Sequence, residues 1–277
     1  MGEGNISSLC LERFSLVSEE VFDSAYEELS PARRGIIKKA IALTHKVMGL
    51  KFSPITSSFK TIAGLDDGRR FVEERTLHPS LSLVLSRGVS SPSQLISLLL
   101  PPRLAGIKEV RVFRCGNGAG DWPAPLVVSL EMLGIDRVFH ISLQELEEVF
   151  PLLQEEGGAV CFLCEDKDKG RFAQFQQGEN VFFFFSPKRA GIFSEDRDKF
   201  DLDEISFSHP SLRIKVVEDE DHMEDLDVLY MDLRRDGLAP SLKIKKVPLL
   251  LSPGWECVWM WRDLFYPVLF NTRIFMG

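Results

Sequence analysis

Cysteine is scarce in this chain, and its spacing excludes a secreted fold held by disulfides. The chain has 277 residues and an odd number of cysteines. They are Cys10, Cys115, Cys161, Cys164 and Cys257. Such a spread suits a reducing compartment. Cys161 and Cys164 spell CxxC, but no second pair completes a zinc ribbon, and in an apolar strand they would point to opposite faces. We interpret both as buried, unreactive side chains.

Long hydrophobic runs and an excess of basic residues are also missing. The most apolar stretches, Leu95–Leu100 and Val181–Phe185, are far too short to span a bilayer. The first fourteen residues lack a basic segment followed by an apolar one, so we expect no secretory signal and a soluble, cytoplasmic protein. The net charge of −8, with a pI of about 5.3, argues against nucleic acid as a partner, and we expect no membrane partner either.

Motifs for metal binding and nucleophilic catalysis are absent from the sequence. It contains no HxxxH, HExxH, GxSxG or Walker pattern, so we expect no zinc site and name no catalytic residue. The acidity is concentrated in Glu218–Asp227, which carries seven acids and no Lys or Arg. This acidic segment lacks the glycine and closing Glu of an EF-hand loop. It is either a solvated loop or a contact for a basic partner.

The first third of the chain predicts helices followed by short strands. Ser18 is placed to cap one helix, and Pro31 suits the first turn of a second helix that Gly49 ends. Short β-prone pieces follow at Lys51–Ile55 and Ser57–Ile62. We therefore predict an N-terminal helical segment with short strands over residues 1–85.

From Ser91 onward, predicted helices alternate with predicted strands. Helices are expected at Pro92–Ala105, at Pro123–Leu133 and after Ser142, and strands at Glu109–Cys115, Arg137–Ile141, Ala159–Cys164 and Val181–Phe185. Gly106 and Gly134 suit the helix ends, and Glu145 completes a capping box with Ser142. The alternation predicts an α/β fold, a Rossmann-like parallel sheet flanked by helices, over residues 86–205. A mixed C-terminal segment, 206–277, is expected to pack on it.

A glycine-rich loop, Gly116–Gly120, follows a predicted strand and precedes a predicted helix. Backbone amides in that position can hold a phosphate. The alternative is that these residues form a connecting loop that binds no ligand. The next strand ends near His140 without the acid that usually binds a ribose. Open α/β sheets bind ligands at the carboxyl ends of their strands. The candidate cofactor-binding residues are therefore Cys115, Gly116, Asn117, Gly118, Asp121, Ser142 and Gln144.

Two segments share a pattern with a known enzyme family. Ser91–Ser93 leads without a gap to Pro101–Val110 (PPRLAGIKEV), and a second match covers Leu133–Phe139 (LGIDRVF). A weaker likeness lies at Leu29–Pro31 and the helix after it. The chain thereby resembles histidinol dehydrogenases, zinc enzymes with the aldehyde dehydrogenase-like fold. The resemblance implies that fold in a divergent and shortened chain, and the shared residues are scaffold positions.

The departures from that family bear on function. The family's Tyr-Val-Pro-Gly-Gly stretch falls on Leu83–Arg87, which lacks both glycines. Glu145 stands where the family has a Gln that contributes to NAD binding, and a carboxylate there would repel an anionic dinucleotide. The family's zinc pair and its Glu-His acid–base pair are missing. We therefore predict a non-catalytic protein that binds a nucleotide or small anion, with NAD as one candidate. An NAD(P)-dependent oxidoreductase with a rearranged active site is the alternative.

The C-terminal segment is rich in tryptophan and offers a third interpretation. Trp255, Trp259 and Trp261 lie within seven residues, and Trp255, Trp259 and Arg262 fall at helical spacing. Such residues serve either as core or as an interface. We predict a homodimer through this aromatic segment, or a plain interaction module that uses it or the acidic segment.

Overall fold

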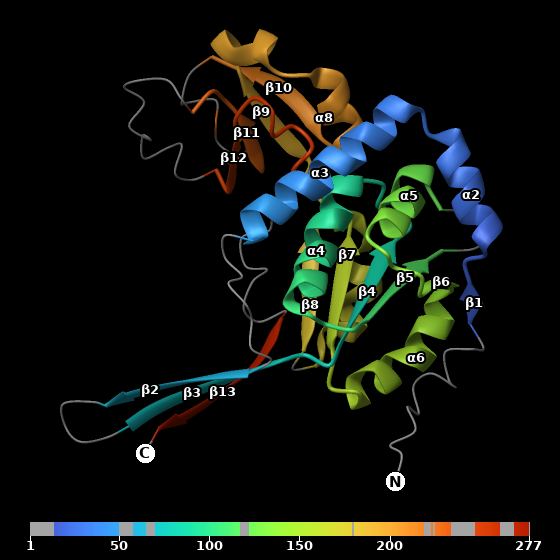
Figure 1. Cartoon of the computed structure of the whole chain (residues 1–277), viewed down its shortest axis with the longest axis vertical. Helices are drawn as coiled ribbons and strands as arrows, with labels where there is room; N and C mark the ends of the chain where they lie inside the picture. The colour runs from blue at the N-terminus through green and yellow to red at the C-terminus, as the bar shows by residue number, and fades with distance from the viewer. Residues whose placement is uncertain are drawn as a thin grey trace.

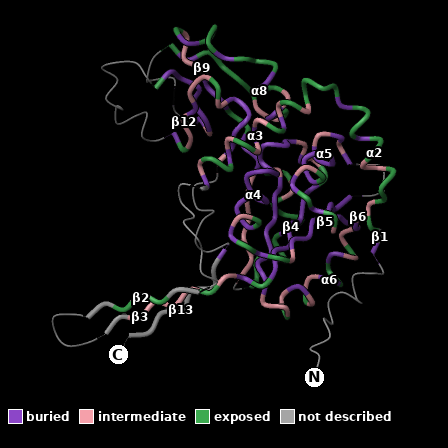
Figure 2. The backbone as a smooth tube through the Cα atoms, in the orientation of Figure 1, coloured by how far each residue is buried: buried purple, intermediate pink, exposed green. Residues whose placement is uncertain are grey.

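The computed structural model describes residues 14–49, 58–64, 70–116, 122–178, 180–218, 223, 225–233, 247–260 and 269–276. Figure 1 shows a central α/β body, a smaller sheet beside one end of it, and a narrow arm that projects from the opposite end. Buried residues are concentrated in the body and in the smaller sheet (Figure 2). Within the described ranges, no helix is both long enough and apolar enough to cross a membrane.

A six-stranded sheet in the order β1-β6-β5-β4-β7-β8 forms the body. Its strands are β1 (Ser15–Leu16), β4 (Ser80–Ser86), β5 (Glu109–Cys115), β6 (Val138–Ile141), β7 (Ala159–Cys164) and β8 (Val181–Phe185). All neighbouring pairs are parallel except β1 with β6. The chain winds outward from β4 through β5 and β6 and then returns to β7, so the winding direction reverses between β4 and β7. This arrangement confirms the predicted Rossmann-like parallel sheet.

Helices cover both faces of this sheet, as the continuous apolar strands require. The longer helices are α2 (Glu19–Glu28), α3 (Pro31–Gly49), α4 (Pro92–Ala105), α5 (Ala124–Met132) and α6 (Leu143–Glu155). The first four pack on the face that carries Leu83, and α6 packs on the face that carries Val84. Gly106 ends α4 at a φ of 92°, and the capping box between Ser142 and Glu145 is present, so both local predictions are confirmed.

A second sheet, all parallel, has the order β10-β9-β11-β12. Its strands are β9 (Arg189–Phe193), β10 (Arg213–Val217), β11 (Val228–Tyr230) and β12 (Leu249–Leu251), and α8 (Leu202–Ser208) packs beside them. The Ser91 hydroxyl donates to the Ser208 carbonyl and the Ser93 hydroxyl to the Cys257 carbonyl, both at 2.6 Å. These bonds fix the start of α4 beneath the second sheet.

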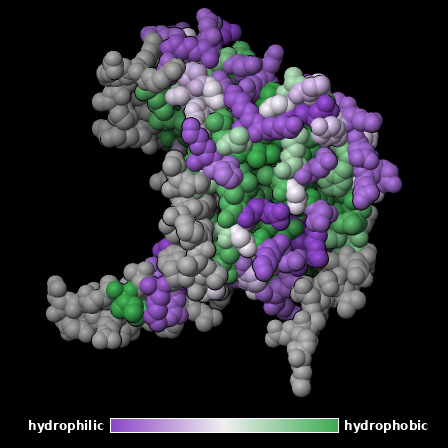
Figure 3. Space-filling model, viewed as in Figure 1, coloured by the Kyte–Doolittle hydropathy of each residue, from purple (hydrophilic) through white to green (hydrophobic). Residues whose placement is uncertain are grey.

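The projecting arm is an antiparallel sheet in the order β13-β3-β2. Its strands are β2 (Ser58–Gly64), β3 (Arg70–Leu77) and β13 (Phe270–Met276), so the last strand of the chain pairs with a hairpin from its first third. Lys60 and Glu74 form an ion pair at 2.6 Å across β2 and β3. Ile62 is 62% exposed, and Figure 3 shows a hydrophobic spot on the arm among hydrophilic side chains.

Sequence reasoning missed several strands, among them β4 and β9. β4 reads SLSLVLS, an alternation typical of a half-buried strand, yet all seven residues are buried at the centre of the sheet. Its serines are tolerated there because they find partners: Ser80 donates to Glu156, and Ser86 accepts from the Glu165 N–H. The helix predicted over 92–105 is present and continues through its two internal prolines, Pro101 and Pro102.

The domain boundaries at 85 and 205 stay a prediction. Sheet membership changes at other places along the chain, since β4 begins at Ser80 and the second sheet begins with β9 at Arg189. The linker Ser186–Lys188 is the direct connection between the two sheets.

Candidate functional site

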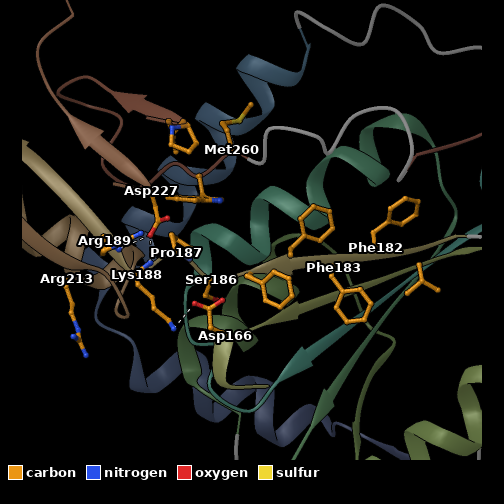
Figure 4. A pocket seen from close by; sticks show the side chains of 16 residues that line it. Asp166, Phe182, Phe183, Ser186, Pro187, Lys188, Arg189, Arg213, Asp227 and Met260 are labelled. Atoms are coloured by element: carbon orange, nitrogen blue, oxygen red, sulfur yellow. Dashed lines mark hydrogen bonds and ion pairs between the residues drawn. The ribbon is translucent and has the colours of Figure 1, made fainter. Parts of the chain in front are cut away.

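A cavity of about 1000 Å³ lies between β8, the last strand of the body's sheet, and the second sheet (Figure 4). All of β8 lines it, together with the linker after β8 and residues of β10 and β12. Figure 4 shows Lys188, Arg189 and Arg213 at one end of the cavity and Phe182 and Phe183 at the other. The site therefore combines an aromatic wall with a cationic end.

The aromatic wall is the sequence Val181–Phe185, whose consecutive side chains alternate between the two sides of the strand. Each of these side chains is half-buried. Phe183 stacks on Phe162 of β7, with ring centroids 4.6 Å apart and planes 6° from parallel. The Phe183 and Phe185 centroids are 6.3 Å apart. Packing against β7 thus holds the rings in place while leaving part of their surface open to a ligand.

The cationic end is built where the chain enters the second sheet. Lys188 and Arg189 follow β8 directly, and Arg213 pairs in register with Arg189 because β10 lies beside β9. The Lys188 ammonium lies 2.8 Å from a carboxylate oxygen of Asp166, and the Arg189 guanidinium lies 3.3 Å from Asp225. Within the described ranges, Arg213 has no carboxylate partner. It is the cation best placed to meet an external anion.

Asp227 fixes the backbone of this end. Its Oδ2 atom accepts the backbone N–H groups of Lys188 at 2.8 Å and Arg189 at 2.9 Å. Asp225 and Asp227 both belong to the acidic segment. The described end of the acidic segment therefore binds the basic residues Lys188 and Arg189 of the same chain.

The sequence-predicted residues on β5 lie at another part of the same sheet edge. Cys115 and Gly116 are buried at the carboxyl end of β5. The exposed side chain of Arg171, in the short helix α7 (Lys169–Phe172), reaches the Cys115 sulfur at 3.9 Å. Sequence reasoning did not find Arg171, because only the fold brings α7 to the end of β5. The other predicted loop residues lie outside the described ranges: Asn117, Gly118 and Asp121.

The predicted residues after β6 surround the start of α6. Ser142 accepts the Glu145 N–H at 3.1 Å, and the Glu145 carboxylate accepts the Ser142 N–H at 2.6 Å. Gln144 is exposed in the first turn. An anionic ligand would approach α6 at its first turn. The Glu145 carboxylate already occupies that turn and accepts the Ser142 N–H. Whether Cys115, Gly116, Ser142 and Gln144 bind a cofactor stays a prediction.

The crevice between β4 and β7 is the usual ligand position in such a sheet, because the winding reverses there. Arg114 fills one side of it: its guanidinium donates to the carbonyls of Val89 at 2.9 Å and Arg87 at 2.6 Å. The Glu165 side chain packs over Gly88 on the other side. The start of α4, which could otherwise hold a phosphate, lies buried under the second sheet. These contacts leave little room for a pyrophosphate.

The described thiols are poor nucleophiles. Burial raises the pKa of Cys115, and it raises the pKa of Cys164 to about 12. Cys161 and Cys257 are also fully buried, and burial raises the pKa of both. Cys161 and Cys164 pack in the cores on opposite faces of the sheet, as predicted. Thiolate chemistry at pH 7 is therefore disfavoured at all four positions.

Among the described residues, no group of three or more His, Cys, Asp or Glu side chains could hold a metal ion. The aromatic C-terminal segment packs inward where it is described. Trp259 is 5% exposed, and its ring lies 5.6 Å from the ring of His209 in an edge-on contact. Residues 255–260 do not form the helix that their spacing suggested, and Trp261 and Arg262 lie outside the described ranges.

Comparison with known proteins places the fold among dehydrogenases. Histidinol dehydrogenase from Elizabethkingia anophelis superposes with a TM-score of 0.57 at 11% identity, over 95% of this chain and 77% of that one. An NAD-dependent benzaldehyde dehydrogenase from Corynebacterium glutamicum gives 0.48 at 10% identity, over 94% and 86%. An indole-3-acetaldehyde dehydrogenase gives 0.47 at 10% identity, over 98% and 86%. No protein-family model and no curated protein sequence matches the chain.

The chain therefore has a distant histidinol dehydrogenase-like fold. This confirms the resemblance drawn from residues 91–110 and 133–139. At 11% identity the likeness concerns the fold alone, and activity has to be argued from the residues of the site.

Proposed function

We propose that this chain is a non-catalytic small-molecule-binding protein on a dehydrogenase-like fold. Its ligand is a small organic anion with a planar aromatic part, of which nucleotides are the leading class. The observation that carries the proposal is one cavity with phenyl rings along one wall and Lys188, Arg189 and Arg213 at one end. The ligand binds there, between β8 and the second sheet.

The size and lining of the cavity support a ligand of this kind. Small-molecule sites usually enclose roughly 300–1,000 Å³ and combine apolar walls with a few polar groups that fix orientation. Aromatic rings prefer offset stacking or edge-on contacts at centroid separations of about 4.5–7 Å, which the half-buried ring of Phe182 can offer to a base. Arg213 can bind a phosphate or carboxylate through two parallel hydrogen bonds.

The chemistry of the lining supports binding rather than catalysis. Among the described residues around the cavity there is no cysteine or histidine. The carboxylates of Asp166 and Asp227 are engaged, with lysine and with backbone N–H groups respectively. A dehydrogenase that oxidises an alcohol needs a group that takes the hydroxyl proton as hydride leaves the carbon, and these residues do not offer one in a free state.

An NAD(P)-dependent oxidoreductase is the second candidate, and the sheet topology favours it. The reversal of winding between β4 and β7 is where dinucleotides bind in Rossmann-like folds. The contacts of Arg114 and the position of Glu165 weigh against it, since they fill that crevice. Under this alternative, NAD would bind more tightly than AMP and would be reduced in the presence of an alcohol or aldehyde substrate.

Calorimetric titration of the full chain with AMP, adenosine and NAD tests the proposal. We expect AMP to bind more tightly than adenosine, because only AMP can use Arg213. Arg213→Gln removes charge-assisted hydrogen bonds and should weaken AMP binding about tenfold. Lys215→Gln, two residues along the same exposed strand and outside the cavity, is the matched control and should bind like the unchanged chain. Absence of AMP binding at millimolar concentration, or equal losses in the two variants, would refute the proposal.

The strand-end residues form the alternative position for the anion. Arg171, Ser142 and Gln144 could together hold a phosphate at the ends of β5 and β6, as the sequence predicted. Arg171→Gln separates the two positions: it should weaken AMP binding only if the phosphate lies there. A cytoplasmic location and a homodimer stay predictions, and light scattering of the purified chain measures the latter.

A further inference from the structure

Asp166 lies at the cavity wall between two lysines. It begins the short 3-10 helix Asp166–Asp168 that follows β7. Its two carboxylate oxygens lie 3.0 Å from the Lys169 ammonium and 2.8 Å from the Lys188 ammonium. Hydrogen bonds from Lys188 and Lys169 lower the pKa of the Asp166 carboxyl. An ionised carboxylate therefore occupies the gap between two cations beside the cavity.

The surroundings of Asp166, Lys169 and Lys188 fit an anion-binding subsite that the carboxylate of Asp166 itself occupies. The Lys169 ammonium also lies 4.2 Å from the centroid of the Phe185 ring, so one lysine touches both the carboxylate and the aromatic wall. Lys188 is held at its backbone by Asp227, which fixes where its side chain starts. Asp166, Phe185 and Lys188 all line the cavity. A ligand whose ring lies against Phe185 would bring its anionic group to the place that Asp166 holds.

We propose that Asp166 is a specificity-determining residue that occupies the anion subsite of the cavity in the free protein and selects phosphate-bearing over carboxylate-bearing ligands. This inference rests on the proposed function, since it assigns a ligand class to the same cavity.

The selectivity follows from the charge that each ligand brings. The side chains of Asp166, Lys169 and Lys188 are 43%, 54% and 49% exposed, so their ion pairs are weak and open at little cost. A ligand carboxylate would only replace the Asp166 carboxylate on the two lysines, so it would gain almost no binding free energy. A phosphate group brings a charge of about −1.5 to −2 and three acceptor oxygens. It can bind both lysines with more charge and more acceptor atoms than a carboxylate, so it outcompetes Asp166.

Phenyl phosphate and benzoate test this directly, because they share one ring and differ in the anionic group. Affinities are measured by calorimetry for the unchanged chain, for Asp166→Asn and for Asp23→Asn, which removes the same charge from the exposed face of α2. We expect the unchanged chain to prefer phenyl phosphate. Asp166→Asn should tighten benzoate about two- to fivefold, tighten phenyl phosphate less, and so reduce the selectivity. Asp23→Asn should leave both affinities unchanged, and thermal unfolding of each variant checks that it is folded.

The outcomes separate this inference from the proposed function. If the unchanged chain binds phenyl phosphate and Asp166→Asn leaves the ratio of the two affinities unaltered, the role of Asp166 is refuted while the cavity remains a binding site. The role is also refuted if Asp23→Asn changes the ratio as much, since net charge would then explain the effect. If neither probe binds to any of the three chains, both proposals fall. Binding of benzoate only after Asp166→Asn would support the role of Asp166 strongly.

Discussion

The carboxyl group of Glu165 packs directly against the backbone of Gly88: a Cβ atom added at Gly88 would clash with the carboxyl carbon. Gly88 belongs to the loop after β4, and Glu165 follows β7, so the contact spans the crevice where the winding of the sheet reverses. The Glu165 carboxylate also forms an ion pair with Lys167. A carboxylate thus stands where a Rossmann-like fold would receive the phosphates of a dinucleotide, and this supports the proposed site in the inter-sheet cavity.

Two glycine substitutions should differ in their effect on stability. The clash in Gly88→Ala involves the end of the Glu165 side chain, which can rotate away. In Gly158→Ala the new methyl group would clash with the Ser80 hydroxyl and would lie 2.8 Å from the Ser80 carbonyl oxygen, and the backbone cannot yield in the same way. We expect urea unfolding to give a loss of about 1–3 kcal/mol for Gly158→Ala and a clearly smaller loss for Gly88→Ala. Equal losses would show that Glu165 is fixed in place.

Stability should fall in acid because of His209. Its Nε2 atom lies 3.1 Å from the Glu256 carbonyl, and burial lowers its pKa to about 4. The unfolded chain takes up a proton at this residue near pH 6.5, whereas the folded chain resists until about pH 4. The contribution is fully present above pH 6.5 and is lost as the pH falls toward 4, by about 3 kcal/mol in all.

The variant His209→Asn isolates this contribution. Its unfolding free energy, measured in urea at several pH values between 7 and 4, should depend less steeply on pH than that of the unchanged chain. His45→Asn, on the exposed side of α3, is the control and should keep the original slope. A His209→Asn slope equal to the original would rule out His209 as a source of acid sensitivity.

Lys39 should help hold α3 to the second sheet. Its ammonium lies 2.7 Å from Glu204 and 3.6 Å from Glu256, whose side chains are only 10% and 4% exposed. Lys39→Met leaves both carboxylates without their shared cation. We expect a loss of about 1–3 kcal/mol in the urea unfolding free energy, less than for a fully buried pair because Lys39 is 38% exposed. Lys38→Met, at the exposed neighbouring position, should change stability by less than about 0.5 kcal/mol.

The local features of the fold could be predicted from the sequence because short-range chemistry sets them. Gly106 and the Ser142–Glu145 pair depend only on neighbouring backbone groups, so their positions were predicted correctly. The central strand β4 was missed because its serines suggest solvent exposure, and only the completed fold brings Glu156 and Glu165 to Ser80 and Ser86.

The cavity could not be predicted in the same way. Lys188 and Arg213 are 25 positions apart in the sequence, and they come together because the pairing of β9 with β10 places the Arg213 N–H on the Lys188 carbonyl at 2.7 Å. The sequence predicted that ligands bind at the carboxyl ends of the strands, and it placed them at β5 and β6. The cavity instead opens where β8 leads into the second sheet, a relationship between two sheets that no single segment encodes.

The position of bound AMP in a crystal structure of the complex tests the central claim most directly. We predict electron density between β8 and the second sheet, with the base against the phenylalanine rings and the phosphate within hydrogen-bond distance of Arg213 and Lys188. Density for AMP at the ends of β5 and β6, beside Ser142 and Arg171, would contradict the account.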